Sequence, residues 1–169
     1  MSTRVRSLTA FFVVLALLCL TVGPVAAGSK TYFTGSETRV EDLDPGEDFY
    51  PDGRFHLRGA VGIFAFQADD SRLDDADNIV VVNWNFAWMP EPVYVSGPMW
   101  GSFILTNDGG YWEGSWTGLR DENGFSYFHF VGHGGGGYDG LQLRMWGERL
   151  TPDGSAPENY HGYILETGG

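Results

Sequence analysis

The segment from Trp112 to Leu143 constrains the fold more than any other part of this 169-residue chain. It alternates aromatic residues with glycine and polar residues, and it includes four consecutive glycines at positions 134–137. Each glycine in a helix interior costs about 1 kcal/mol, so a helix is disfavoured here. Strands accept glycine where they bend or where another group packs closely above them. The segment therefore predicts a curved antiparallel sheet, which closes most economically into a barrel.

Eight stretches of the chain are predicted to be strands, because each is bounded by glycine-, proline- or aspartate-containing turn signals. No window of helical periodicity competes with them beyond residue 27. Many short strands at even spacing are typical of a sandwich or barrel. We predict an all-β domain, an eight-stranded antiparallel up-and-down barrel. Its predicted strands are Thr31–Val40, Arg54–Gln67, Asn78–Met89, Val93–Thr106, Tyr111–Leu119, Phe125–Gly132, Tyr138–Arg149 and Tyr160–Glu166.

Alternation along the predicted strands assigns their faces. Trp112 and Trp116 share one face of a strand with Gly114 and Gly118. Large side chains alternating with glycine suit a tapered barrel interior, where a glycine leaves room for a ring from across the barrel. The two tryptophans are therefore predicted to point inward, either as core filling or as the wall of a ligand site.

Residues 1–27 have the composition of an export signal. Two arginines precede an apolar stretch from Leu8 to Val22, and small residues end the segment at Ala27. The apolar stretch is shorter than the roughly 20 residues that a membrane-spanning helix needs. We predict a cleaved signal peptide at 1–27, followed by a single barrel domain at 28–169 that is secreted or periplasmic and is not an integral membrane protein.

Cys19, the one cysteine of the chain, lies within the predicted signal. A lipid attached to Cys19 and a retained membrane anchor are the alternatives to cleavage. After cleavage at residue 27 the domain has no cysteine, so its core must hold it together without disulfides. The signal contains none of the 22 acidic residues and two of the ten basic ones, which leaves the domain a formal charge of −14. A domain this acidic is repelled by phosphate backbones, so nucleic acid is a poor partner.

The glycine run invites two comparisons. Gly134 to Gln142 matches one copy of a calcium-binding nonapeptide, but that pattern needs tandem copies and the chain has no second one. Gly134, Gly136 and Tyr138 resemble the strand-preceding glycine motif of the allene oxide cyclase and dirigent proteins, although His133 stands where that motif begins with glycine. The resemblance implies a calycin-like eight-stranded barrel with an apolar cavity, often trimeric, that holds hydrophobic small molecules. We expect the four glycines to be a flexible lead into the strand Tyr138–Arg149.

Acid–base chemistry needs a carboxylate or histidine beside an apolar pocket. Four residues within predicted strands qualify: Glu37, Glu113, His129 and Glu166. Among them, Glu113 and His129 are the predicted catalytic pair. Arg58, and also Arg144, could hold an anionic ligand by charge-assisted hydrogen bonds.

No metal site is predicted. His129 and His133 are four residues apart on one strand, about 13 Å, which is too far to share a tetrahedral zinc ion. The loop from Ala68 to Asp77 contains five aspartates, but their spacing does not fit a calcium-binding EF-hand loop. We expect them to form a solvated acidic loop, with calcium binding as the alternative.

Three functional hypotheses follow, none of which needs a cofactor. The leading one is a secreted barrel that binds a hydrophobic small molecule inside, with ligand contacts from Arg58 and aromatic walls. A cofactor-free cyclase or isomerase, acting through one buried Glu or His, is the second. The third is a glycan-binding or surface-assembly module that uses exposed Trp88 and Trp100. The predicted aromatic walls of the leading hypothesis are Trp84, Trp112, Trp116 and Phe128.

Overall fold

The computed structural model describes residues 28–87, 96–152 and 156–166. This part of the chain is almost entirely extended. None of its helices is long and apolar enough to span a bilayer. The elements are β1 (Lys30–Asp44), β2 (Glu47–Phe49), the 3-10 helix η1 (Pro51–Gly53), β3 (Arg54–Ala68), β4 (Ala76–Ala87), β5 (Gly97–Asn107), β6 (Gly110–Arg120), β7 (Ser126–Gly136), β8 (Leu141–Arg149) and β9 (Glu158–Glu166).

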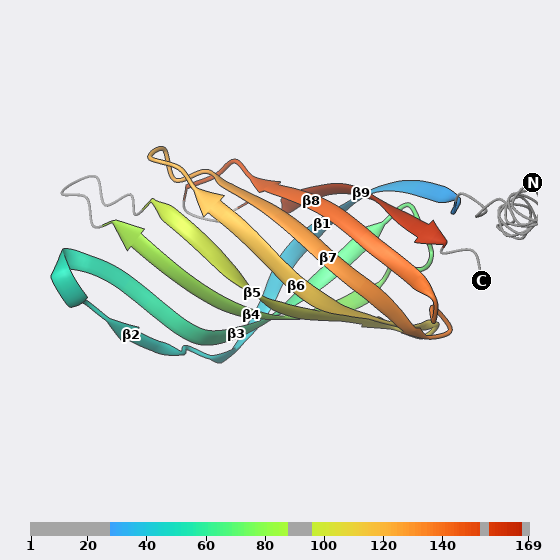
Figure 1. Cartoon of the computed structure of the whole chain (residues 1–169), viewed down its shortest axis with the longest axis horizontal. Helices are drawn as coiled ribbons and strands as arrows, with labels where there is room; N and C mark the ends of the chain where they lie inside the picture. The colour runs from blue at the N-terminus through green and yellow to red at the C-terminus, as the bar shows by residue number, and fades with distance from the viewer. Residues whose placement is uncertain (1–27, 88–95, 153–155, 167–169) are drawn as a thin grey trace, which may run out of the picture.

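Eight of the strands close into an antiparallel barrel (Figure 1). From β3 to β9 each strand pairs with the next one in sequence, and β1 closes the barrel by pairing with both β9 and β3. Glu37 of β1, for example, lies opposite Glu158 on one side and Phe66 on the other. The predicted eight-stranded up-and-down barrel is thus confirmed. The short strand β2, which was not predicted, pairs with residues 56–58 of β3, beyond the part of β3 that pairs with β1.

Several predictions lie outside the described residues. These are the signal peptide and Cys19, the ends of two predicted strands within 88–95, and Trp88. Their outcome therefore stays open.

Side chains alternate between the barrel interior and its outer surface, as the sequence predicts. Trp112 and Trp116 are buried inside, whereas their neighbours Tyr111 and Thr117 are exposed. On β8, Leu143 and Met145 are buried inside in the same way. Burial of these apolar side chains supplies the main driving force for closing the barrel.

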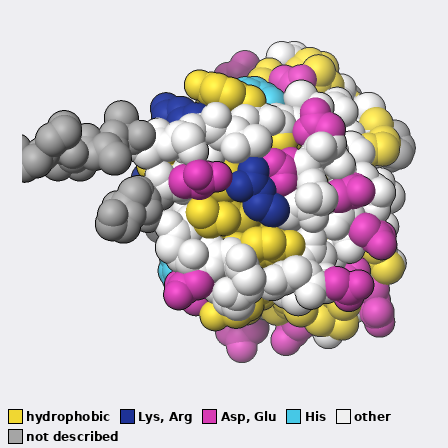
Figure 2. Space-filling model, turned by 90° about the vertical axis from the view of Figure 1, so that its right-hand side faces the viewer, with side chains coloured by type: hydrophobic (Ala, Val, Ile, Leu, Met, Phe, Trp, Pro, Cys, Tyr) yellow, Lys and Arg dark blue, Asp and Glu magenta, His cyan; other side chains and the backbone are white. Residues whose placement is uncertain are grey.

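One end of the barrel is closed by the loop between β3 and β4. Leu73 at the centre of this loop is fully buried. Trp112 Nε1 donates a hydrogen bond of 2.9 Å to the carbonyl oxygen of Arg72, which ties the loop to β6. Figure 2 looks onto this end and shows it covered by side chains, with basic and acidic groups next to each other. The termini of the described chain lie at the same end (Figure 1).

The aspartates of this loop make structural hydrogen bonds. Asp69 accepts bonds of 2.8 and 2.9 Å from the backbone nitrogen and hydroxyl of Thr34. Asp70 accepts bonds from the backbone and guanidinium of Arg72, and Asp74 accepts one from the backbone of Ala68. These carboxylates satisfy backbone donors that the tight loop leaves unpaired, the usual role of aspartate in turns.

The four glycines are not a flexible lead into β8, and that prediction is wrong. Gly134 to Gly136 form the end of β7, and β8 begins only at Leu141. Tyr138 folds back over the closed end, where its ring stacks on Trp112 at 5.2 Å and its hydroxyl donates a 2.6 Å bond to Asn107 Oδ1. A side chain at Gly134 would overlap the backbone of Tyr138. Gly134 therefore provides space for Tyr138 to close the barrel, and Gly135 provides space for the ring of Tyr111.

Candidate functional site

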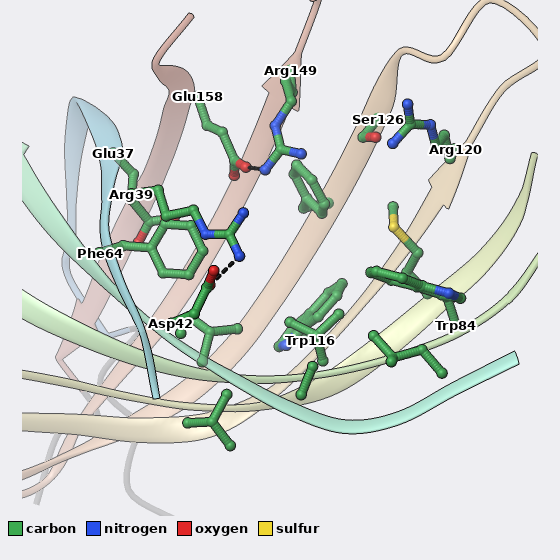
Figure 3. Close-up of a pocket in the computed structure, with 18 of the residues that line it drawn as sticks. Glu37, Arg39, Asp42, Phe64, Trp84, Trp116, Arg120, Ser126, Arg149 and Glu158 are labelled. Atoms are coloured by element: carbon green, nitrogen blue, oxygen red, sulfur yellow. Dashed lines mark hydrogen bonds and ion pairs between the residues drawn. The ribbon is translucent and has the colours of Figure 1, made fainter. Parts of the chain in front are cut away.

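The interior of the barrel contains a cavity of about 610 Å³. Its opening lies at the end opposite the loop, between the β1–β2 segment and the ends of β6 and β8. The walls are mostly aromatic and aliphatic, and charged side chains gather towards the opening (Figure 3). The aromatic residues of the wall are Phe55, Phe64, Trp84, Phe86, Trp116, Phe128, Phe130 and Tyr160.

The cavity exists because one side of the barrel carries small inward side chains. Ala60 and Gly62 of β3 and Val80 and Val82 of β4 all line it. The large ring of Trp116 on β6 lies close to Gly101 of β5, and its Nε1 donates a 3.1 Å bond to the carbonyl of Val81 on β4. Because the small residues fill little of the space on their side, part of the barrel interior stays open.

Gly114 and Gly118 were expected to make room for a ring from across the barrel, but they accommodate groups of the adjacent strand instead. A side chain at Gly114 would overlap the backbone of β7, so this glycine allows close approach of two strands. At Gly118 a β-carbon would lie 3.0 Å from the ring of Phe128, its partner on the adjacent strand. The glycines on this face therefore accommodate neighbouring backbone and rings, and the open space lies on the β3–β4 side.

A buried polar network lies against the wall of the cavity. Glu37 is 3% exposed, and its Oε1 accepts a 2.6 Å bond from Nδ2 of Asn78. Its Oε2 lies 2.9 Å from the hydroxyl oxygen of Tyr160, which in turn lies 2.6 Å from Oε2 of Glu158. Glu158 forms an ion pair with Arg149. The network thus runs from the depth of the barrel towards its opening (Figure 3).

The hydrogen count of this network indicates which carboxyl group more readily takes a proton. A tyrosine hydroxyl has one hydrogen, so Tyr160 can donate to only one of the two carboxyl groups that it contacts. Glu158 forms an ion pair with Arg149, which makes it the better acceptor. When Tyr160 donates to Glu158, a protonated Glu37 can donate to the oxygen of Tyr160. The chain of donors then runs Glu37 to Tyr160 to Glu158.

Burial favours the same protonation state. It raises the pKa of Glu37 from 4.5 to about 7, although the hydrogen bonds from Asn78 and Tyr160 act in the opposite direction. Burial together with the nearby Glu37 also raises the pKa of the Tyr160 hydroxyl well above 10. A carboxyl group with a pKa near neutrality, placed at the wall of an apolar cavity, can both give and take a proton at physiological pH.

Three arginines line the cavity near its opening: Arg39, Arg120 and Arg149. Arg39 pairs with Asp42, and Arg149 pairs with Glu158. Arg120 donates a 2.7 Å bond to the carbonyl of Pro152 and forms no ion pair with any carboxylate of the described residues. Burial lowers the pKa of the Arg120 guanidinium, and the charge of Asp121 acts against that shift.

The predicted aromatic walls are mostly found where the sequence placed them. Trp84, Trp116 and Phe128 line the cavity. Trp112 is fully buried in the closed end, under Tyr138, and does not line the open space. Its indole is therefore part of the barrel closure and is not available to a ligand.

Arg58 lies on the outer surface, because a bulge in β3 turns it away from the interior. Its guanidinium donates to the carbonyl of Trp84 at 2.8 Å and to Asn85 Oδ1 at 2.6 Å. It also lies 5.0 Å from the ring centre of Trp100, which was predicted as a glycan contact. Arg58 therefore contacts β4 and β5 on the outside of the barrel and does not line the cavity.

Glu113 and His129, the predicted catalytic pair, both point out of the barrel. Glu113 has a side chain that is 44% exposed and lies 3.2 Å from Nε2 of His133. His129 stacks on Trp146 at 5.1 Å on the outer face of β7 and β8. Neither side chain lies in the cavity, because each alternates with an inward residue of its strand. Glu166 is also exposed, and of the four acid–base candidates only Glu37 lines the cavity.

Sequence reasoning missed several polar residues of the cavity. Glu158, Tyr160, Arg120 and Arg149 were not singled out, although strand alternation could have indicated three of them. Glu158 and Tyr160 lie on the same face of β9 as the buried Ile164, and Arg149 continues the inward face of Leu143 and Met145. The remaining residue, Arg120, ends a strand, where alternation is a weak guide.

No protein-family model matches the chain, and no curated protein or solved structure matches it at a significant level. Within the described residues, no three His, Cys, Asp or Glu side chains are grouped so that they could hold a metal ion. The cavity and its polar network are therefore the features from which a function is inferred.

Proposed function

We propose that the barrel binds a hydrophobic small molecule in its interior. The observation that carries this proposal is the cavity of about 610 Å³, which is open at one end and lined by aromatic and aliphatic side chains, with charged groups towards the opening. Volumes of roughly 300 to 1,000 Å³ with apolar walls and a few polar groups are typical of small-molecule sites. An interior this open also favours binding inside the barrel over the glycan-binding module.

The shape of the barrel supports a single route for the ligand. The loop that carries Leu73 fills one end, and the charged opening lies at the other. An apolar molecule that enters past the opening reaches Trp84, Trp116 and Phe128, where it exchanges contact with water for contact with rings. The proposed site is therefore a blind pocket, and export of the domain through the signal at 1–27 remains part of the proposal.

The binding proposal is tested with Nile red, a neutral apolar dye whose fluorescence rises when it leaves water. Val82→Phe fills the cavity, and we expect it to weaken dye binding by about tenfold or more. Ile79→Phe on the same strand is the matched control, because Ile79 is 40% exposed on the outer surface. Equal dye binding by the wild type and Val82→Phe would contradict the proposal.

A second candidate function is cofactor-free isomerisation or cyclisation of the bound molecule by proton transfer. Glu37 supports it, because its carboxyl group lines the cavity and burial brings its pKa to about 7. The Tyr160 hydroxyl beside it can pass a proton on towards Glu158. General acid–base catalysis needs such a group within reach of the substrate.

Proton exchange measures this activity without knowledge of the substrate. We expect the protein to speed deuterium uptake next to the carbonyl of an apolar ketone such as 2-decalone in heavy water, followed by NMR. Glu37→Gln should abolish the acceleration and keep Nile red binding. Glu113→Gln, on the outer face, is the control and should change neither. Acceleration that persists in Glu37→Gln would rule out this role for Glu37.

A further inference from the structure

Two hydrogen-bond donors of the cavity wall lack an acceptor. Nε of Arg120 and Nε1 of Trp84 are buried, and neither has a hydrogen-bond partner among the described residues. Both residues line the cavity (Figure 3). The one other such side-chain atom of the described residues, Oδ1 of Asn78, belongs to the side chain that holds Glu37 and is not part of the cavity wall. Neither atom is itself exposed to the open space, so a ligand would meet Arg120 through the part of its guanidinium that lines the cavity.

The positive charge of Arg120 has no ion-pair partner among the described residues, although the charge of Asp121 acts on it. Burial lowers the pKa of the Arg149 guanidinium, and the charges of Arg120 and Arg39 lower it further. Asp42 and Glu158 neutralise Arg39 and Arg149, whereas Arg120 has no ion-pair partner in the described chain. A partly buried cation without a counter-ion is unfavourable, so an anion bound at this position would be stabilised by the charge of Arg120.

Acidic side chains also line the opening, but they lie on its other side. Asp42, Asp44 and Asp48 belong to the β1–β2 segment. Arg120 ends β6, which stands four strands from β1 in either direction around the barrel. Asp44 is engaged by the backbone nitrogen of Gly46 at 2.8 Å. The opening is therefore divided into an acidic side and a basic side, and the basic side holds the unpaired charge.

The two free donors come from neighbouring parts of the wall. Trp84 pairs with Met99, Met99 pairs with Gly118, and Gly118 precedes Arg120 by two residues. Ser126, which is buried directly opposite Arg120 on β7, adds a hydroxyl at the level of the opening. Polar recognition is thus concentrated at the opening, and the apolar rings lie below it.

We infer that the ligand is an amphiphile with an anionic head group, a carboxylate being the simplest, which is held by Arg120 while its apolar body fills the cavity. This inference rests on the proposed binding function and specifies its ligand class. A guanidinium offers a carboxylate two parallel hydrogen bonds, and such bonds are stronger than those between neutral groups. The apolar body would lie against Trp84, Trp116 and Phe128, with the neutral Glu37 below.

Displacement of Nile red by three compounds with the same twelve-carbon chain tests the inference on the wild-type protein. Dodecanoate should displace the dye about tenfold more tightly than its methyl ester, and dodecylammonium should be the weakest of the three. Equal affinities of acid and ester, or a preference for the ammonium compound, would overturn the inference. If the dye itself does not bind, the proposed function and the inference both fail.

Variants then assign the preference to one residue. Arg120→Gln should remove the preference for dodecanoate over its ester and leave the ester affinity within about twofold. Arg120→Lys, which keeps the charge, should restore most of the preference. Arg144→Gln is the matched control, because it removes the same charge from the outer face of β8. A preference that survives Arg120→Gln but not Arg144→Gln would overturn the role of Arg120.

Discussion

The carboxyl Oε2 of Glu37 lies 2.9 Å from the hydroxyl oxygen of Tyr160, although the two residues are 123 positions apart in the chain. They meet because β1 closes the barrel against β9. This contact joins the most deeply buried acid of the cavity to a chain of groups that ends at the ion pair near the opening. Burial of Glu37 at this position makes the stability of the barrel depend on pH.

The protonated state of Glu37 should be visible in the free energy of unfolding. The folded protein retains this proton up to about pH 7, whereas the unfolded chain releases it near 4.5, so stability falls as the pH rises through this window. The shift corresponds to about 3 kcal/mol. Glu37→Gln, a neutral isostere, should therefore gain about that much relative to the wild type between pH 4 and 8. Urea denaturation across this range measures it, and parallel pH profiles would contradict it.

The ion pair between Arg149 and Glu158 should contribute far more to stability than the one between Arg39 and Asp42. Arg149→Met leaves the buried Glu158 carboxylate without a counter-charge, and we expect a loss of about 3 kcal/mol. Arg39→Met breaks an exposed pair and should cost less than about 1 kcal/mol. Thermal and urea unfolding of both variants compare them; similar losses would contradict the burial argument.

Gly134 should tolerate no side chain. In Gly134→Ala the new methyl group would meet the backbone of Tyr138, so the closed end has to shift, at an expected cost of about 1 to 3 kcal/mol. His133→Ala, at the exposed neighbouring position of β7, should leave stability nearly unchanged. If both variants unfold at the same temperature as the wild type, Gly134 is not required for the close packing of Tyr138.

Leu73 should be essential to the closed end. It is fully buried in the loop between β3 and β4, so Leu73→Ala should reduce the free energy of unfolding by about 2 to 5 kcal/mol. The same substitution at Leu119, which is 53% exposed on β6, should have little effect. Equilibrium denaturation distinguishes them, and a small loss at Leu73 would show that the loop is not part of the core.

The sequence predicted the barrel well because its main signals are local. Alternation placed Trp116 and Met145 inside, and turn residues separated the strands. Alternation failed for the glycine run, because the reason for Gly134 is the return of Tyr138, a contact that no pattern of period two describes. The edge strand β2 was also missed, since three exposed residues in an acidic segment carry almost no periodic signal.

The site was less predictable than the fold. Glu113 and Glu37 are both strand carboxylates, and their opposite placement depends on the phase of each strand relative to the barrel. For Glu37 that phase is readable from buried Phe33, four residues earlier on the same face. The convergence of Glu37, Tyr160 and Glu158 requires closure of the barrel, which no single segment of the sequence specifies.

The position of the chain ends has a consequence for how the molecule can be displayed. Ser29 and Glu166 are joined by a 2.8 Å hydrogen bond at the end that the Leu73 loop seals. A domain attached to a surface or a carrier next to Ser29 or Glu166 would therefore have its sealed end towards the attachment and its opening towards the solvent. Tethering would leave the exchange of its contents with the surroundings unobstructed.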